Sequence, residues 1–195
     1  MKYAILPVLL ASGLFSNSLI ANDSPVFTFA EVFYVQSDSN DDLDTKDLGI
    51  KGSYELSDYF FVEANYAQTS GDIVNIDVDF DTFQYDLGAK YDFDNAITVF
   101  ASYNLGDWKV KSKDNSKITL DVDTIKLGLH SQVSELIELN AALTSTDIEN
   151  VDRKSGFVLG GNYKFSDTWH ITTEFSRIAG EVDLDQLSLG IRKTL

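Results

Sequence analysis

The sequence predicts an all-β protein, an up-and-down antiparallel transmembrane β-barrel of about ten strands, with eight strands as the alternative. Apolar and polar residues alternate with a period of two through most of the chain. The polar segments between the alternating runs are short and long in turn, as in hairpins joined by tight turns at one end and loops at the other. The chain also begins with an apolar leader, which indicates export.

Residues 82–93 show the alternation most clearly. One face of this run is apolar or aromatic throughout and the other is polar or charged, a pattern that fits a strand and no helix. Similar runs, each entered by an Asp-apolar-Asp segment, recur along the chain, so the repeating unit is a β-hairpin. The two faces are Phe83, Tyr85, Leu87, Ala89, Tyr91 and Phe93, and Thr82, Gln84, Asp86, Gly88, Lys90 and Asp92.

Residues 1–21 are expected to be a cleaved signal peptide and residues 22–195 the barrel domain. The leader has a lysine, an apolar stretch and then small residues up to Ala21, after which we place the cleavage. The chain contains no cysteine, and its net charge of −16 argues against binding to nucleic acid. Beyond the leader no run approaches the ~20 apolar residues of a spanning helix, so strands must cross any membrane.

Ten runs are expected to be strands, and each has apolar or aromatic residues at alternate positions. Both prolines lie outside these runs, because a spanning sheet has no water to satisfy an unpaired backbone group. In chain order, the runs with residues of their apolar faces are 26–36 (Val32, Tyr34), 47–56 (Leu48, Ile50), 59–69 (Phe60, Val62), 82–93 (Leu87, Tyr91), 97–106 (Tyr103), 124–133 (Ile125, Leu127), 137–146 (Ile137), 156–165 (Phe157, Phe165), 169–179 (Trp169) and 186–195 (Leu187, Leu189).

Four connections are expected to be three-residue turns built from Ser, Asp and similar turn-forming residues. Such a turn pairs the residue before it with the residue after it, for example Leu56 with Phe60, so the apolar face continues from one strand to the next. The other connections are longer and mostly acidic. This asymmetry is typical of outer-membrane barrels. The short turns are expected at residues 57–59, 94–96, 134–136 and 166–168.

The apolar face is expected to face lipid and the charged face the lumen, the reverse of a soluble barrel. The charged face carries glycines, which leave room for long side chains in a narrow interior. On the apolar face aromatic residues gather near both strand ends, as in the girdles at membrane interfaces. The expected girdles are Phe60, Tyr91, Phe93, Phe165 and Trp169 near the turns, and Tyr34, Tyr66, Phe83, Tyr85, Tyr103 and Phe157 toward the loops.

The chain after the leader resembles small bacterial outer-membrane β-barrels of the OmpA, OmpX and opacity-protein type, which are often called porin-like. Residues 187–195 resemble the C-terminal strand by which the barrel-assembly machinery recognises this class, except that Leu195 replaces the usual Phe and Lys193 lies on the lipid-facing row. Lys193 can extend its amine to the nearby interface. The resemblance implies an integral outer-membrane protein whose partners are outer-membrane lipid, lipopolysaccharide and the assembly machinery.

Charged side chains on the lumen row are expected to pair, because an isolated charge in a narrow interior is costly. The turns place Lys51 diagonal to Glu63 and His130 diagonal to Glu138. Arg192 meets Glu31 only if the last strand closes on the first. An ion-paired, packed interior and the selectivity lining of a pore are both possible. The expected network comprises Glu31, Lys51, Glu63, Asp86, Lys90, Lys126, His130, Glu138, Lys164, Glu174 and Arg192.

Beyond the membrane the alternation continues with reversed polarity. Apolar residues such as Phe80, Val122 and Leu184 take the inward positions, where they would close the mouth, and aspartates take the outward positions. These aspartates either solvate extended hairpins or bind Ca²⁺ or Mg²⁺, which prefer such oxygen ligands. The candidate metal ligands at this extracellular rim are Asp79, Asp81, Asp121, Asp123, Asp183 and Asp185.

An enzyme is not expected. The only histidines, His130 and His170, lie near the short turns, whereas the barrel enzymes of this class act at the outer rim. The sequence favours a non-enzymatic barrel with an ion-paired, plugged interior, acting in envelope integrity, adhesion or surface interaction. A small porin-like channel for ions or small solutes is the alternative. No cofactor is expected besides the possible divalent cations, and the sequence identifies no surface ligand.

Overall fold

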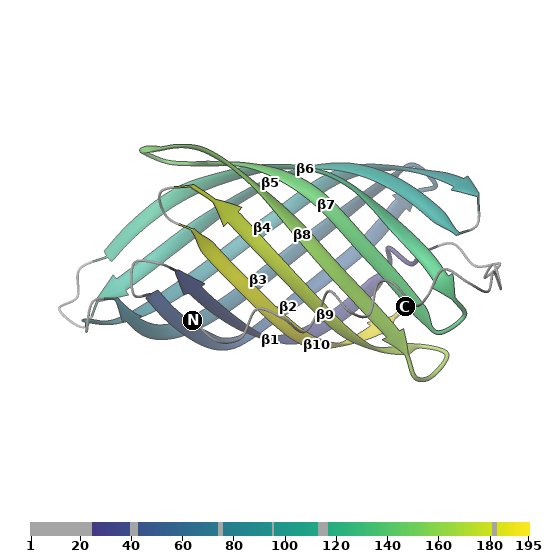
Figure 1. Cartoon of the computed structure of the whole chain (residues 1–195), viewed down its shortest axis with the longest axis horizontal. Coiled ribbons are helices and arrows are strands. Elements are labelled where there is room, and N and C mark those ends of the chain that lie inside the picture. The colour runs from purple at the N-terminus through teal and green to yellow at the C-terminus, as the bar shows by residue number, and fades with distance from the viewer. Residues whose placement is uncertain (1–24, 40–42, 74–75, 95, 113–116, 181–182) are drawn as a thin grey trace.

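The computed structural model describes residues 25–39, 43–73, 76–94, 96–112, 117–180 and 183–195, which form one closed antiparallel barrel (Figure 1). The expected signal peptide, residues 1–21, lies outside these ranges. No helix in the described ranges is long and apolar enough to cross a membrane. The strands are β1 (Phe29–Ser39), β2 (Leu43–Ser57), β3 (Phe60–Ile73), β4 (Ile76–Asp94), β5 (Ile97–Ser112), β6 (Lys117–Ser134), β7 (Ile137–Ile148), β8 (Val151–Lys164), β9 (Trp169–Ala179) and β10 (Leu184–Thr194).

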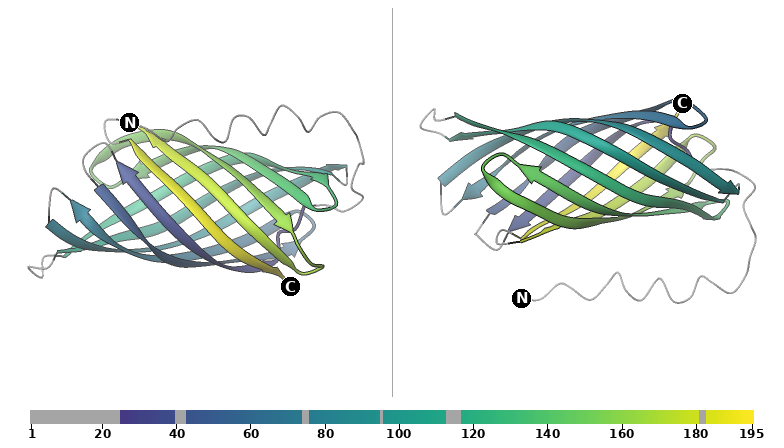
Figure 2. Two further views of the ribbon diagram at one scale, coloured as in Figure 1. Left: turned by 60° about the horizontal axis from the view of Figure 1, so that its bottom comes forward. Right: turned by 90° about the horizontal axis from the view of Figure 1, so that it is seen from above.

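Pairing of the first strand with the last closes the barrel. β1 pairs with β2 on one side and with β10 on the other, in a register that places Glu31 opposite both Lys51 and Arg192. Each other strand pairs with its neighbours in sequence, so the sheet has no free edge. The strands run obliquely around the barrel axis (Figure 2). The predicted fold class and the count of ten strands are confirmed, and the eight-strand alternative is wrong.

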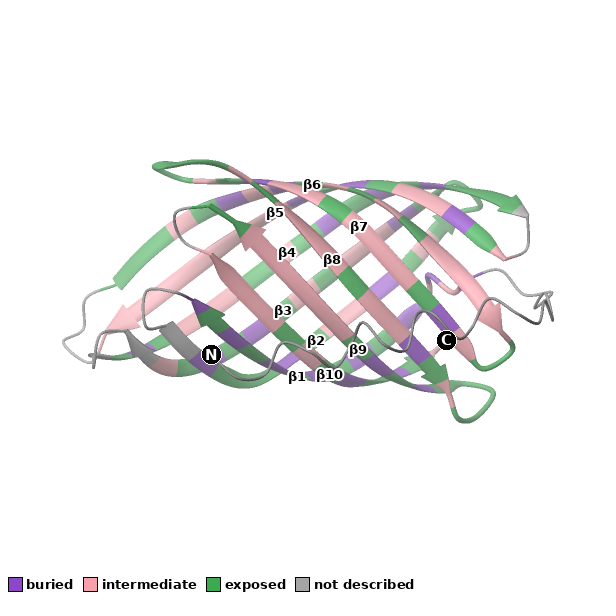
Figure 3. Ribbon diagram, viewed as in Figure 1, coloured by how far each residue is buried: buried purple, intermediate pink, exposed green. Residues whose placement is uncertain are grey.

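Burial alternates along the strands, as the coloured bands of Figure 3 show. On β4, Leu87 and Tyr91 are 60% and 58% exposed on the outer face, whereas Asp86 and Lys90 are 6% and 7% exposed and face the lumen. The outer wall is therefore the apolar face, as predicted. We call the end of the barrel with the β2–β3, β4–β5, β6–β7 and β8–β9 connections the turn end, and the opposite end the loop end.

The strands extend farther toward the loop end than the sequence predicted. β4 begins at Ile76 rather than at residue 82, and residues 107–112 and 117–123, expected to be loop, belong to β5 and β6. The expected loop at 147–155 is a tight turn, in which Asn150 adopts a φ of 63°, a left-handed conformation that asparagine tolerates. The extensions stay in the sheet because alternation continues there, with only its polarity reversed.

The short turns keep the apolar face continuous from strand to strand, as predicted, but three of them are not the expected three-residue turns. Between β2 and β3, Ser57 pairs with Phe60 and Leu56 is an extra residue in a bulge, so the connection is a two-residue turn plus a bulge. The β4–β5 and β6–β7 turns have the same register shift. One bulged residue added to a two-residue turn preserves the parity of a three-residue turn. At β8–β9 the Phe165 amide donates to the Trp169 carbonyl at 3.1 Å, the predicted pairing.

The exposed outer position of Leu87 gives a test of the topology. We expect Leu87→Arg to lower the free energy of unfolding from lipid vesicles by ~2–4 kcal/mol, the cost of a charge near the midplane of a lipid-facing barrel wall. The measurement is urea unfolding of the vesicle-inserted protein, followed by tryptophan fluorescence. Thr119→Arg, at an exposed position of the β6 extension, is the matched control. Equal losses for the two variants would contradict the placement of the membrane.

Candidate functional site: lumen and outer rim

A buried ion pair lies where the barrel closes. The Arg192 guanidinium reaches the Glu31 carboxylate at 2.7 Å, and both side chains are buried. The Thr172 hydroxyl also donates a hydrogen bond to Glu31, at 2.9 Å, and the guanidinium lies 3.6 Å from the centroid of the Phe29 ring. Strands β1, β9 and β10 are thus joined by charge-assisted contacts as well as by the backbone.

A second group of charges surrounds Asp86 in the middle of the lumen. The Lys126 amine lies 3.1 Å from this carboxylate. The Ser102 hydroxyl and the Asn104 amide donate to it at 3.0 and 2.7 Å. Asp86 therefore has both a counter-ion and hydrogen-bond donors, which is what a buried carboxylate requires.

Lys51 connects two strands that are not neighbours in the sheet. Its amine lies 3.5 Å from the Glu174 carboxylate, so β2 is joined inside the lumen to β9, from which β1 and β10 separate it. Glu63, the remaining expected member of this central group, has no basic side chain of the described residues within ion-pair distance. It lies opposite Asp86 in the β3–β4 register. The Lys51 pair follows from closure of the sheet, and strand parity alone does not reveal it.

Two further pairs lie near the turn end. His130 Nδ1 is 3.1 Å from Glu138, and the Asn162 amide donates to the same carboxylate at 3.0 Å. Lys90 is 2.9 Å from Glu55, whose inward position on β2 the expected network had omitted. Most of the predicted lumen row is thus brought together in pairs.

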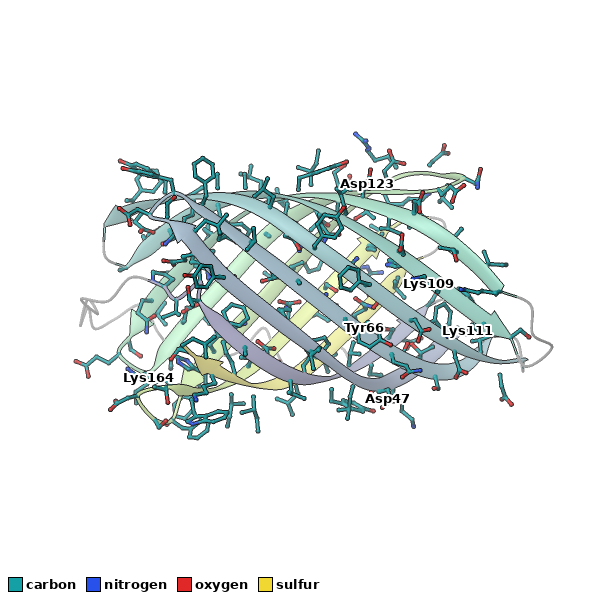
Figure 4. The ribbon with its side chains drawn as sticks, turned by 180° about the vertical axis from the view of Figure 1, so that it is seen from behind. Asp47, Tyr66, Lys109, Lys111, Asp123 and Lys164 are labelled. Atoms are coloured by element: carbon teal, nitrogen blue, oxygen red, sulfur yellow. The ribbon has the colours of Figure 1, made fainter. Side chains whose placement is uncertain are left out.

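Lys164 lies apart from the network. It pairs with His170 in the β8–β9 register at the turn end, and no carboxylate in the described part of the chain lies within ion-pair distance of its amine. Figure 4 shows Lys164 near one end of the barrel, with Lys109 and Lys111 toward the other. Lys164 is therefore a rim residue of the turn end.

An aromatic cluster lies in the lumen at the turn end. It consists of Phe27, Phe61, Phe100 and His130. The Phe27 ring is 4% exposed and stacks on His130 with a centroid distance of 4.8 Å, and it lies 4.9 Å from the Phe61 centroid. Phe100 meets His130 edge-on at 5.2 Å. Phe27 precedes β1, so the segment before the first strand enters the barrel and closes this cluster.

Lumen glycines accommodate these aromatic rings. A methyl group at Gly88 would overlap the Phe61 ring on the neighbouring strand, and one at Gly128 would overlap the Phe100 ring. The sequence had predicted that glycines leave room for long side chains in general. In the structure the side chains that they accommodate include cross-strand phenylalanines, a known way of packing glycine in a sheet.

Described residues of the lumen line two adjoining cavities. The larger, of about 210 Å³, is lined by residues of the aromatic cluster and by the central charges. The smaller, of about 120 Å³, lies among Phe33, Val35 and Ala67 and shares Lys51 and Trp108 with the larger. Both have polar side chains in their walls, so they can hold water.

Apolar residues face inward at the loop end, as the reversed pattern predicted. Val122 has no exposed surface, and Val78 on β4 is buried. Phe80 and Leu184, also expected to close the mouth, are half-buried. The inward side of the strand extensions therefore forms a partial apolar core above the membrane.

The outward aspartates are partly neutralised by basic residues of the chain itself. Lys111 forms an ion pair with Asp81, and this contact raises the pKa of Lys111 above its ordinary value, so the amine stays charged at neutral pH. Arg177 contacts Asp183 at 2.9 Å and Asp185 at 3.4 Å. Half of the six candidate metal ligands thus have a counter-ion.

The other three candidate ligands do not converge. Asp123 accepts a hydrogen bond from the Tyr103 hydroxyl at 2.9 Å. Asp79 and Asp121 are exposed, and no basic side chain of the described residues lies within ion-pair distance of either. Within those residues no three Asp, Glu, His or Cys side chains are grouped so that they could hold a metal ion. The cation site at the rim stays a prediction.

Sequence reasoning missed the aromatic lumen. Phe61, Phe100 and Trp108 share the parity of the lumen charges, so the alternation already placed them inside, but only charged residues had been assigned there. Trp108 was expected in a loop because β5 extends beyond its predicted end. Glu55 shares a face with Lys51 and could have been found in the same way. Phe27 shares the parity of Glu31 in the expected strand 26–36, so the alternation placed it on the lumen face, and the folded barrel shows that its ring stacks on His130.

Removal of Glu31 should strongly destabilise the barrel. Glu31→Gln leaves Arg192 charged and buried without its partner, a change that typically costs about 3–5 kcal/mol. The double variant Glu31→Gln with Arg192→Met should lose less than the sum of the two single losses, because no isolated charge remains. Urea unfolding of all four proteins in lipid vesicles measures this coupling. Additive losses would show that the ion pair contributes little.

The rim aspartates can be tested for binding of divalent cations. If they bind Ca²⁺, millimolar Ca²⁺ should raise the unfolding temperature more than NaCl of equal ionic strength, because binding adds a mass-action term to screening. Asp79→Asn with Asp121→Asn should remove this difference, whereas Asp147→Asn, at a residue paired with Arg153, should preserve it. If the two salts raise the unfolding temperature of the parent protein equally, the aspartates bind no divalent cation and only solvate the rim.

Several solved structures share the fold. The translocator domain of the autotransporter NalP from Neisseria meningitidis aligns with a TM-score of 0.59 and 10% identity, over 96% of this chain and 92% of that one. The NanC porin gives 0.53 and 6%, over 84% and 100%. Neisserial surface protein A gives 0.50 and 9%, over 87% and 98%. At these identities the similarity shows the fold alone.

The sequence itself identifies the family. No curated protein matches the chain. Residues 10–191 match the outer membrane protein beta-barrel domain family. This match covers nearly the whole chain and agrees with the closed barrel, the apolar outer wall and the charged lumen described above. The chain belongs to the outer membrane protein beta-barrel domain family and is an outer-membrane protein.

Proposed function

We propose that the protein is a closed, non-enzymatic outer-membrane barrel that presents its extended strands at the cell surface and acts in envelope integrity, adhesion or surface interaction. The position of Phe27 carries this proposal. Its ring lies inside the turn end, stacked on His130 and close to Phe61. A ring buried on several sides at the mouth of a narrow lumen obstructs the passage of solutes.

The central charges support the same conclusion. The Lys51–Glu174 pair joins β2 to β9 inside the lumen, and the Lys126–Asp86 pair lies beside it. Separating such pairs in a low-dielectric interior is costly, so they resist rearrangement to admit a solute. The buried side chains of Val78 and Val122 narrow the loop end. The lumen is thus obstructed at the turn end, at its centre and at the loop end. Such obstruction is more typical of a structural or adhesive barrel than of a diffusion pore.

The histidines support a non-enzymatic role. His130 is held by Glu138 and by the aromatic cluster, and His170 is buried at the turn end, near Arg192 in the β9–β10 register. Neither lies at the outer rim, where a surface substrate would arrive. The surface that the protein does present there is formed by the strand extensions, with alternating acidic and basic side chains such as Asp81, Lys111 and Arg177. We propose that this rim contacts the surface partner.

A small channel is the second candidate. The two lumen cavities favour it, because they share Lys51, Asn65, Gln84 and Trp108 in their walls and thus adjoin one another within the lumen. Buried polar atoms without partners, such as Asn65 Oδ1, show that this region is suited to water. In such a channel the aromatic cluster would be the constriction.

Planar-bilayer conductance distinguishes the two functions. We expect the parent protein to show no steady open-channel current. Phe27→Ala should produce ion conductance, because it removes the ring that completes the aromatic cluster. Phe93→Ala, at an outer-wall phenylalanine near the same end, is the matched control and should stay silent. Steady current through the parent protein would contradict the closed barrel and establish the channel.

A further inference from the structure

The outer wall carries an apolar groove across β10, β1, β2 and β3, which reaches from Lys193 near the turn end to Tyr66 and Phe83 toward the loop end. Its volume is about 570 Å³, and its lining is almost entirely apolar. A smooth barrel wall covered by side chains of equal size offers lipid no such depression. The groove lies outside the lumen and shares no function with the ion-pair network. Its outward-facing lining residues include Ala30, Val32, Ile50, Gly52, Ala64 and Tyr66.

Strand register explains why the wall is hollow here. Ala30 on β1 lies opposite Gly52 on β2, and Gly52 lies opposite Ala64 on β3, so three small residues form one continuous row across three strands. The next row toward the loop end, with Ile50 and Tyr66, has large side chains. Since neighbouring strands are ~4.8 Å apart, three small residues on three adjacent strands form a trough about 10 Å long, bounded by larger side chains.

Gly52 is not required by packing. A methyl group there would meet only the Phe29 carbonyl oxygen, at an ordinary contact distance of 3.8 Å. Gly88 differs, because a methyl group at that position would overlap the Phe61 ring. A side chain at position 52 would therefore fit and would fill the groove. The packing of the barrel would thus allow a larger residue at position 52, so it does not by itself require the hollow.

A cation lies at one end of the trough. Lys193 is opposite Ala30 in the β1–β10 register, and its amine is 5.8 Å from the centroid of the Trp169 ring. No carboxylate in the described part of the chain lies within ion-pair distance of it. On the described outward-facing strand positions, from the loop-side aromatic girdle to the turn end, Lys193 is the one charged side chain. The turn end faces the periplasm in barrels of this layout, so Lys193 lies at the headgroups of the inner leaflet.

We propose that this groove binds an anionic phospholipid, with an acyl chain along the Ala30–Gly52–Ala64 row and the headgroup phosphate at Lys193. The groove has an apolar trough and a cationic end, which match the acyl chain and the anionic headgroup of such a lipid. An apolar trough removes hydrocarbon from contact with mobile lipid, and an unpaired amine at its interfacial end attracts an anion. Trp169 beside Lys193 is a residue type that settles at the headgroup level. A zwitterionic phospholipid would also fill the trough, but its phosphate is already balanced by its own ammonium group, so it attracts the Lys193 amine less than an anionic phospholipid does.

The two tryptophans make the site measurable. Trp169 lies at the groove, whereas Trp108 lines the lumen cavities, and the chain contains no other tryptophan. In a Trp108→Phe background, all tryptophan emission therefore comes from the groove. The protein is inserted into phosphatidylcholine vesicles that contain a minor fraction of a lipid brominated in its acyl chains, which quenches a nearby indole. Brominated phosphatidylglycerol is compared with brominated phosphatidylcholine at equal fractions.

We expect brominated phosphatidylglycerol to occupy the site with about a fivefold preference, the Boltzmann equivalent of one basic residue acting near an anionic surface. Lys193→Gln should abolish the preference for the anionic lipid while some quenching by both lipids remains. Gly52→Leu should reduce quenching by phosphatidylglycerol to the level of phosphatidylcholine, because its side chain fills the trough. Ala101→Leu, at an exposed small residue of the β5 outer wall, should behave as the parent does.

Three results would overturn the proposal. Equal quenching by the two lipids in the parent would show ordinary lipid contact. A preference that persists in both Lys193→Gln and Gly52→Leu would place the anionic lipid elsewhere. Low quenching by both lipids that rises when the protein is diluted in the membrane would show that a second copy of the chain covers the groove. If Gly52→Leu does not insert, the Lys193→Gln comparison decides alone.

Discussion

The structure depends on one constraint: in the membrane, each backbone N–H and C=O must find its hydrogen-bond partner within the protein. A sheet meets this condition only if its first and last strands pair, and here β1 pairs with β10 over the full length of both strands. Glu31 and Arg192 lie opposite each other in that pairing and are held at 2.7 Å in the buried interior. Side-chain charge thus reinforces the seam that closes the barrel.

In the closed barrel, one alternation of residues is matched to three environments: lipid, the lumen and the water beyond the membrane. Between the girdles, outward residues such as Leu87 meet lipid and inward residues such as Asp86 meet the lumen. Beyond the membrane the parity continues without interruption, but its polarity reverses because the outside is now water. Val122 is consequently buried inside and Asp121 exposed outside on the same strand. The barrel therefore extends past the bilayer as a folded rim, with its own small apolar core and its own ion pairs.

The lumen contains both buried ion pairs and large aromatic side chains. Phe61 and Phe100 fit in the lumen because the residues opposite them on β4 and β6 are glycines. The aromatic cluster that they form with Phe27 and His130 occupies the turn end, so the central ion pairs are confined above it. On the outer wall small residues act differently, since Gly52 leaves a hollow that no ring fills. The same residue type thus packs the lumen on one face and opens a groove on the other.

The sequence by itself determined the lipid-facing and lumen-facing rows and the reversed rim, because each follows from a period of two that is written locally. It predicted about ten strands but left eight open, and the closed pairing of the sheet decided the number. It could not determine contacts made across the barrel. Several contacts depend on register and closure: the Lys51–Glu174 pair, the stacking of Phe27 on His130, the Arg177 contacts that neutralise two rim aspartates, and the alignment of Ala30 with Gly52 and Ala64. Parity fixes the direction in which a side chain points, whereas only the closed sheet fixes which side chain it meets.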